Sequence, residues 1–362
     1  TVFVQEKALK FCKQQELQKA MDKAQKIITE GDFESYDKVE GLVRNALQVG
    51  EIDKGQTDIF ANLDTVLDED YRHPIPMGIP GIDRLLKGGL AKGEIGVILA
   101  PTGVGKTTIL TKIANTAFNL GYNVLQVFFE DNPKIIQRKH FTLWTGIEPD
   151  NLVKNKDEVM SKVTEIQETM QNKLVLKKLA SDSMTMNQIK NQVRKMIADG
   201  NKLDLVMLDY IDCVLPESTS KDEWKAEGSV MRGFEAMCHE LDLVGWTATQ
   251  GNRSSISAEV VTTDQMGGSI KKAQVGHVII SVAKTLQQKE MNLATIAITK
   301  SRLGKDGVVF ENCKFNNELL EIDTESSVTF LGFEEQQEER KRDRVKELME
   351  KRKQKEEQKQ QS

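Results

Sequence analysis

The sequence predicts an α/β fold: a mainly parallel sheet flanked by helices. From Gly78 onward, short continuous apolar runs alternate with helical stretches. Such runs are typical of strands buried on both faces, and the intervening helices favour right-handed crossovers within one sheet. A glycine-rich turn joins the first run to a helix at 108–119, a unit that belongs to this fold class. The expected strands are 95–100, 124–129, 203–208, 244–249, 277–283 and 293–299.

Two helical segments are expected before this domain. Residues 1–50 carry one apolar stripe at Leu17, Met21, Ala24 and Ile28, and a second between Tyr36 and Leu47. Together they predict either a helical hairpin that packs on itself or a docking surface for a neighbouring subunit. Residues 51–77 predict a linker with a short amphipathic helix. His73-Pro74-Ile75-Pro76 ends that helix, because proline disfavours helix at its own position and at the one before it.

Residues 78–333 form the expected α/β domain, and residues 334–362 form a charged, glutamine-rich tail. The tail has no apolar face wide enough to bury, which predicts a disordered segment or a solvated helix. The chain starts with Thr1 rather than methionine, which suggests a fragment or a processed product with a segment missing upstream. No internal repeat is evident.

Composition favours a soluble protein of a reducing compartment. Hydrophobic residues make up 39% and charged residues 29%, as in ordinary globular proteins. The scattered cysteines and histidines form no zinc-binding pattern, and there is neither an apolar run of about 18 residues nor a signal peptide. We therefore expect a cytoplasmic protein. A net charge of −5 neither favours nor excludes nucleic-acid binding, because the binding charges can line one surface or a channel.

The strongest chemical signal is the segment from Ala100 to Thr108. Glycines between a buried strand and a helix let backbone N–H groups turn around phosphates, and the helix N-terminus adds its positive end. Lys106 is expected to reach the β- and γ-phosphates of ATP, and the Thr107 hydroxyl to bind Mg²⁺. Ala100 stands where the usual pattern has its first glycine. A glycine turn without a ligand is the alternative. The expected nucleotide-binding residues are Pro101, Thr102, Gly103, Val104, Gly105, Lys106, Thr107 and Thr108.

Two acidic residues follow expected strands. Asp209 closes an apolar run and points to the crevice where such sheets bind ligands, so we expect it to hold Mg²⁺ through water. Glu130 follows the run 124–129, where a carboxylate can polarise the water that attacks the γ-phosphate. From chemistry alone Asp131 is an equal candidate, and a surface acid at the start of a loop is the plain alternative.

Polar residues also follow two later strands. Gln250 can contact the γ-phosphate and report hydrolysis to the small, polar stretch 251–268, where a motor would hold its track. An ordinary loop is the alternative. Lys300 and Arg302 are two apart on an extended segment and point the same way, so they could reach the phosphate of a neighbouring protomer. A solvated hairpin turn explains their spacing equally well.

Together these motifs resemble the RecA-type ATPase domain of DnaB-family replicative helicases, particularly the T-even-type bacteriophage branch. The resemblance covers roughly residues 58–325. It is carried by Gly78-Ile79-Pro80-Gly81-Ile82-Asp83, the phosphate loop, Phe129-Glu130, Leu208-Asp209-Tyr210, Gln250-x-x-Arg253, Gly267-Gly268-Ser269-Ile270 and Lys300-x-Arg302.

The resemblance implies a RecA-like P-loop domain in a homo-hexameric ring that uses ATP and Mg²⁺. It implies that Glu130 is the catalytic carboxylate and that Lys300 and Arg302 act in trans on the next subunit's ATP. Residues 58–71 would be a helix that docks on a neighbour, and residues 1–50 the last helices of the family's N-terminal region. The implied activity is 5′-to-3′ translocation on single-stranded DNA with unwinding at a fork, in partnership with a primase and a helicase loader.

The DNA-contacting residues depart from the family pattern. That family often carries an Arg-Glu pair before the Gly-Ser-Ile element, where this chain has Gln265 and Met266. The candidate DNA contacts are Arg253, Gln265, Gly268, Lys271 and Lys272. Two rival functions stay open: a RecA- or KaiC-like oligomeric ATPase that does not unwind, and a clamp that uses ATP only to close around DNA. The Lys-x-Arg element and Glu130 favour turnover over the clamp.

Overall fold

The computed structural model describes residues 2–30, 39, 42–43, 46, 59–60, 67, 71–217, 223–267 and 270–325. The chain forms two compact units, Thr1–Tyr71 and Arg72–Ser362. The second stripe near 36–47, the linker helix at 58–71 and the tail 334–362 lie wholly or largely outside the described residues. No helix in the described part of the chain is long and apolar enough to cross a membrane.

The first unit contains helix α1, Val2–Glu30. The apolar stripe expected on this helix is only partly buried. Ala24 is buried, whereas Met21 and Ile28 are more than half exposed. Helix formation over residues 17–28 agrees with the prediction, but the face that was expected to be covered stays largely open within this chain.

The second unit is built on a nine-stranded sheet in the order β3-β2-β4-β5-β1-β6-β7-β8-β9. All neighbours from β3 to β6 are parallel, and those from β6 to β9 are antiparallel. The strands are β1 Ile95–Ala100, β2 Val124–Phe128, β3 Leu174–Lys178, β4 Leu205–Asp209, β5 Val244–Gln250, β6 Val278–Ala283, β7 Leu293–Ser301, β8 Val308–Asn316 and β9 Glu321–Asp323. The mainly parallel α/β fold is therefore confirmed.

Three strands were missed. The half-buried edge strand β3 ends in two lysines, so it lacks the continuous apolar run that marks a doubly buried strand. Strands β8 and β9 alternate buried and exposed residues toward the sheet edge, which is the pattern of antiparallel strands. The run 293–299 is strand β7, which pairs antiparallel with β6, so the sheet is mainly rather than wholly parallel.

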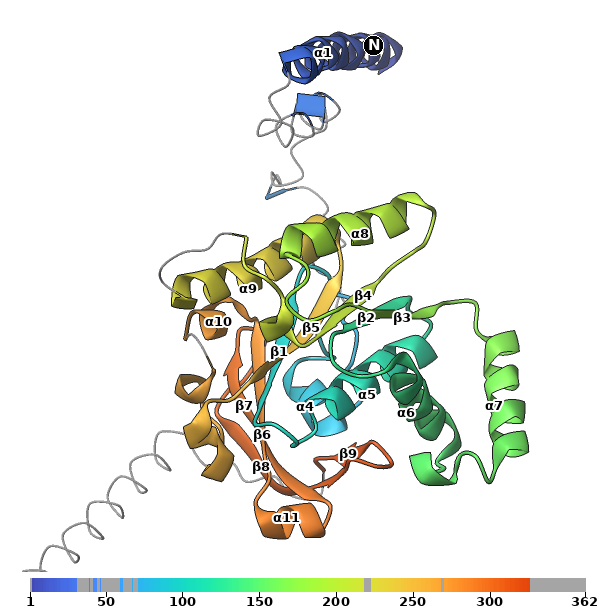
Figure 1. Cartoon of the computed structure of the whole chain (residues 1–362), viewed down its shortest axis with the longest axis vertical. Helices are drawn as coiled ribbons and strands as arrows, with labels where there is room; N and C mark the ends of the chain where they lie inside the picture. The colour runs from blue at the N-terminus through green and yellow to red at the C-terminus, as the bar shows by residue number, and fades with distance from the viewer. Residues whose placement is uncertain are drawn as a thin grey trace, which may run out of the picture. The chain divides into compact units, whose positions relative to one another are not determined.

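Helices cover both faces of this sheet (Figure 1). A separate hydrophobic core lies on each face, and alternate residues of β1 point into one or the other. Ile98 packs in the core with α4 and α5, whereas Val97 packs in the core with α8 and α9. The α-helices are α4 Pro80–Leu85, α5 Lys106–Asn119, α6 Pro133–Thr145, α7 Lys156–Thr169, α8 Met186–Ala198, α9 Glu223–Glu240, α10 Ile270–Val275 and α11 Leu286–Glu290. Short 3₁₀ turns are η2 Pro149–Asn151, η3 Ile211–Cys213, η4 Arg253–Ser257 and η5 Thr263–Gln265.

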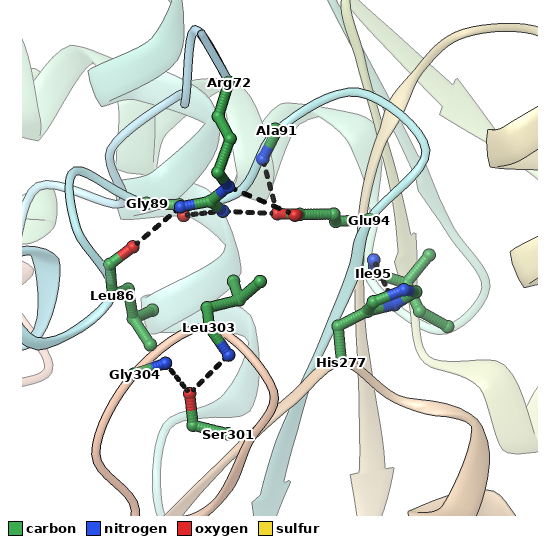
Figure 2. Close-up of polar contacts among 10 residues, drawn as sticks. All are labelled: Arg72, Leu86, Gly89, Ala91, Glu94, Ile95, His277, Ser301, Leu303 and Gly304. Atoms are coloured by element: carbon green, nitrogen blue, oxygen red, sulfur yellow. Dashed lines mark hydrogen bonds and ion pairs between the residues drawn. The ribbon is translucent and has the colours of Figure 1, made fainter. Parts of the chain in front are cut away.

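Polar contacts secure the N-terminal end of the central strand β1 (Figure 2). Arg72 pairs with Glu94 at 2.7 Å and also donates to the carbonyl oxygens of Leu86 and Gly89. The backbone N–H of Ile95 donates to Nδ1 of His277 at 3.2 Å. These contacts hold the end of β1 opposite to the phosphate loop, so the loop leaves a rigid strand.

A buried polar network ties α6 to α5 and to β2. His140 is 2% exposed. Its Nδ1 lies 3.2 Å from Asn115 Nδ2, and its Nε2 lies 3.0 Å from Gln126 Oε1. This arrangement requires a neutral ring that accepts at Nδ1 and donates at Nε2. Burial lowers the pKa of His140 to about 3.

The fold should therefore lose stability in mild acid through His140. The unfolded ring takes up a proton below its ordinary pKa of about 6.5, whereas the folded ring does not until about pH 3. The contribution of the neutral His140 ring to the free energy of unfolding is complete well above pH 6.5. It is lost as the pH falls from 6.5 toward 3, by up to about 1.4 kcal/mol per pH unit. We expect the free energy of unfolding in urea, measured from pH 7.5 to 5, to fall more steeply for the wild type than for His140→Gln. Equal slopes would contradict the assignment, because the carboxylate contributions are common to both proteins.

Candidate nucleotide site

The glycine-rich segment leaves β1 at Ala100, as expected, and enters α5 at Lys106, two residues before the expected start of the helix. Gly105 caps the helix with φ 122°, a left-handed conformation that other residues rarely adopt. A Cβ at Gly105 would also lie 2.5 Å from Asn317 Oδ1 and 2.8 Å from the Phe315 ring. Both the backbone angle and the close packing therefore require glycine here.

The Lys106 side chain folds back over this loop. Its Nζ lies 3.4 Å from the carbonyl oxygen of Ala100 and 3.5 Å from that of Pro101. Burial lowers its pKa, while the nearby carboxylates of Asp209, Asp212 and Glu130 oppose that shift. The half-buried ammonium group of Lys106 therefore lies among three acids at the glycine-rich loop.

The two expected magnesium ligands lie together. Asp209 ends β4, is 6% exposed, and hydrogen-bonds the Thr107 side chain at the start of α5. Burial raises the pKa of Asp209 to about 6, and the Thr107 contact opposes the shift. A hydroxyl and a carboxylate oxygen on rigid elements are the donors that Mg²⁺ prefers, so these residues fit the ion.

The adjacent acids Glu130 and Asp131 have different surroundings. Glu130 accepts a hydrogen bond of 3.0 Å from the Tyr210 hydroxyl, and Lys106 Nζ lies 5.6 Å from the Tyr210 ring centroid. Burial raises the pKa of Tyr210, so its phenol stays a donor. Asp131 instead pairs with Lys139 on α6 at 3.6 Å. Tyr210 belongs to the Leu208-Asp209-Tyr210 motif, but sequence reasoning assigned it no role.

Gln250 reaches the phosphate loop across the β1–β5 pair. It lies opposite Ala100 in register, and its Nε2 donates to Thr102 Oγ1 at 2.6 Å. Its backbone N–H donates to Asp212 Oδ2 at 3.0 Å. Asp212 was not predicted, because nothing in the sequence separates it from any other acid in a loop.

The expected DNA contacts do not share one environment. Arg253 begins η4 and is exposed, and Lys271 on α10 is half-buried. Gln265 is held within the loop: its Oε1 accepts from the Thr262 N–H at 3.0 Å and its Nε2 donates to the Ser254 carbonyl at 3.4 Å. Gly268 lies outside the described residues.

The placement of Lys272 corrects the expectation that it faces a DNA phosphate. It is 3% exposed and forms an ion pair with Asp212. In the sequence, Lys271 and Lys272 look equivalent. Successive side chains on a helix point in different directions, and of these two lysines it is Lys272 that faces the core.

Lys300 and Arg302 lie where β7 turns into β8, so the hairpin expected as the plain alternative is present. Both side chains do point the same way, toward the end of α10. Lys300 Nζ donates to the carbonyl oxygens of Ala273, Gln274 and Gly276 at 2.7–2.8 Å, and Arg302 Nη2 donates to Gln274 at 2.7 Å. Burial, with Arg302 nearby, lowers the pKa of Lys300 to about 8.

Two curated proteins are similar to parts of this chain. A protein described as a DnaB-like replicative helicase of Enterobacteria phage T4 is 20% identical over 268 residues, 70% of this chain and 56% of that protein. The DNA repair protein RadA of Mycobacterium tuberculosis is 28% identical over 112 residues, 31% of this chain and 23% of RadA. The chain thus spans about half or less of these curated relatives.

Two solved structures share the fold at 18% identity. One, described as an ATPase domain, gives a TM-score of 0.59 over 69% of this chain and 91% of that domain. A DnaB-like replicative helicase, described together with its interactions with primase, gives a TM-score of 0.68 over 85% of this chain and 76% of its own. Residues 74–323 match the family described as the DnaB-like helicase C-terminal domain. Because that match covers more than half of the sequence, the chain belongs to the DnaB-like helicase C-terminal domain family.

Proposed function

We propose that this chain is the motor of a replicative DNA helicase, which couples ATP hydrolysis to 5′-to-3′ movement along single-stranded DNA and to unwinding at a fork. ATP and Mg²⁺ are its cofactors, and the ATP lies between the protomers of a homo-hexameric ring. A primase and a helicase loader are the proposed partners. The solved DnaB-like helicase described with its primase supports the first of these by analogy.

One observation carries the proposal: the candidate sensor lies at the base of the candidate DNA loop. The Gln250 side chain contacts the phosphate loop, and its backbone carbonyl accepts from the Gly267 N–H at 2.8 Å. The Asn252 N–H donates to the Gln265 carbonyl at 2.7 Å. The stretch 251–267 therefore leaves Gln250 and returns to it, so a movement of Gln250 moves both ends of the loop.

Each side chain has a defined task in the proposed reaction. Lys106 offsets the charge of the β- and γ-phosphates, and Glu130 polarises the attacking water. Thr107 and Asp209 would hold Mg²⁺, which neutralises charge between the phosphates when bound. Gln250 contacts the γ-phosphate. Lys300 and Arg302 serve the ATP of the next protomer, which requires them to leave the α10 carbonyls in the closed interface.

Strand displacement tests the function directly. With ATP, the protein should release the shorter strand from a fork that has a 5′ single-stranded tail, and it should fail on a substrate with only a 3′ tail. Lys106→Ala is the matched control, since it removes the phosphate contact. DNA-stimulated ATP hydrolysis without strand release would instead support the oligomeric ATPase.

We assign the contacts with single-stranded DNA to Arg253 and Lys271 rather than to the buried Lys272. In titrations with labelled single-stranded DNA, Arg253→Ala should weaken binding and flatten its dependence on salt, because each lost phosphate contact removes a slope of about 0.7 in log–log form. A salt slope equal to that of the wild type would exclude Arg253 from the track.

A further inference from the structure

Asp212 joins the sensor strand to helix α10. It lies on η3, directly after β4, and its carboxylate accepts from the Thr249 hydroxyl at 3.0–3.1 Å and from the Gln250 N–H at 3.0 Å. The same carboxylate forms an ion pair with Lys272 of α10. One side chain thus contacts both the residue that senses the nucleotide and the helix that follows the DNA loop.

The buried ammonium group of Lys272 fixes the position of α10 relative to Asp212. Its Nζ contacts Asp212 and the Gly267 carbonyl oxygen, the latter at 3.2 Å. A buried charge is costly unless it is paired and hydrogen-bonded, and removing one partner leaves the other uncompensated. The position of α10 is therefore tied to the position of Asp212.

The C-terminal end of α10, which begins beside Lys272, contacts the two residues proposed to act on the next protomer. Lys300 contacts three carbonyl oxygens at the helix C-terminus, and Arg302 contacts one of them. These carbonyls have no partners within the helix, and their negative end favours cations. Since α10 spans only six residues, Lys272 and the carbonyls that Lys300 and Arg302 contact lie within about two turns of the chain.

We propose that Asp212 and Lys272 are positioning residues that link the nucleotide sensor of one protomer, through α10, to the Lys300 and Arg302 pair that serves the next ATP site. This inference rests on the proposed ring motor. When Gln250 moves with the γ-phosphate, its backbone N–H moves the carboxylate of Asp212, and Lys272 moves with that carboxylate. Helix α10 then moves with Lys272, and its C-terminal carbonyls change the positions of Lys300 and Arg302. ATP bound at one site thereby promotes hydrolysis at the neighbouring site, which is a coupling free energy between sites.

The test is the cooperativity of ATP hydrolysis in the assembled ring on single-stranded DNA. The wild type should give a sigmoidal dependence of rate on ATP concentration, with a Hill coefficient above about 1. Lys272→Met keeps the apolar stem but removes the charge, and should bring the Hill coefficient to about 1. Lys272→Arg keeps the charge and should restore the sigmoidal curve. Lys195→Met removes a charge from the exposed last turn of α8, away from Asp212 and α10, and should leave the Hill coefficient at its wild-type value.

Each outcome separates the link from the underlying function. A wild-type Hill coefficient in folded, assembled Lys272→Met rings would show that the pair only stabilises the loop, and would overturn the proposal. A non-cooperative wild type would overturn it as well. Absence of ATP hydrolysis in the wild type would overturn the proposed function itself. If Lys272→Met fails to assemble, Asp212→Asn decides instead: it still accepts from Thr249 and Gln250 but lacks the charge that holds Lys272.

Discussion

Arg302→Ala should bind ATP almost as tightly as the wild type and hydrolyse it on the order of 10³-fold more slowly. Arg302 is exposed at the β7–β8 turn, and it contacts the Gln274 carbonyl rather than any residue of its own phosphate loop. Its loss should therefore spare nucleotide binding within the same chain. A guanidinium group delivered across an interface stabilises the charge that develops on the γ-phosphate, which accounts for the size of the effect.

Mixed rings test whether Arg302 acts in trans. Arg302→Ala subunits keep an intact phosphate loop, whereas Lys106→Ala subunits bind ATP poorly but keep Arg302. In rings that contain both, some interfaces pair an intact Lys106 with an intact Arg302, so ATP hydrolysis should return although neither parent is active. If no activity returned at any mixing ratio, with mixed rings verified by mass, the site would be complete within one chain.

Glu130→Gln should retain nucleotide binding and ring assembly, and should lose hydrolysis by about 10²–10⁴-fold. The amide cannot polarise the attacking water, but the phosphate-loop contacts do not involve this side chain. Glu130 lies against the Tyr210 hydroxyl beside Lys106, while Asp131 is paired with Lys139. The matched variant Asp131→Asn should therefore hydrolyse ATP at close to the wild-type rate.

Steady-state ATP hydrolysis with parallel nucleotide-binding measurements distinguishes the two acids. Near wild-type turnover in Glu130→Gln combined with loss of turnover in Asp131→Asn would transfer the role to Asp131. Loss in both variants with normal binding would mean that the Asp131–Lys139 ion pair positions the loop that carries Glu130.

The sequence alone was sufficient to locate the elements that have a characteristic pattern of consecutive residues. A doubly buried parallel strand must be almost wholly apolar, so β1, β2, β4, β5 and β6 could be located within about two residues. The phosphate loop was recognisable because its glycines, lysine and hydroxyl residues are consecutive. Asp209, Glu130 and Gln250 became candidates for a related reason: they end or closely follow parallel strands, whose carboxyl ends meet at one edge of the sheet.

Only the tertiary structure decided which polar residues are partners across long distances in the chain. Lys271 and Lys272 are adjacent and chemically alike, yet packing of α10 buries only Lys272, against an acid 60 residues earlier. Lys300 and Arg302 contact backbone carbonyls. Every residue has a carbonyl group, so no side-chain pattern in the sequence indicates which ones are the partners. The antiparallel direction of β7 likewise depends on the return of the chain through α11, a global property of chain path. Local chemistry therefore determined the candidate nucleotide site, whereas three-dimensional packing determined how that site is connected to the rest of the domain.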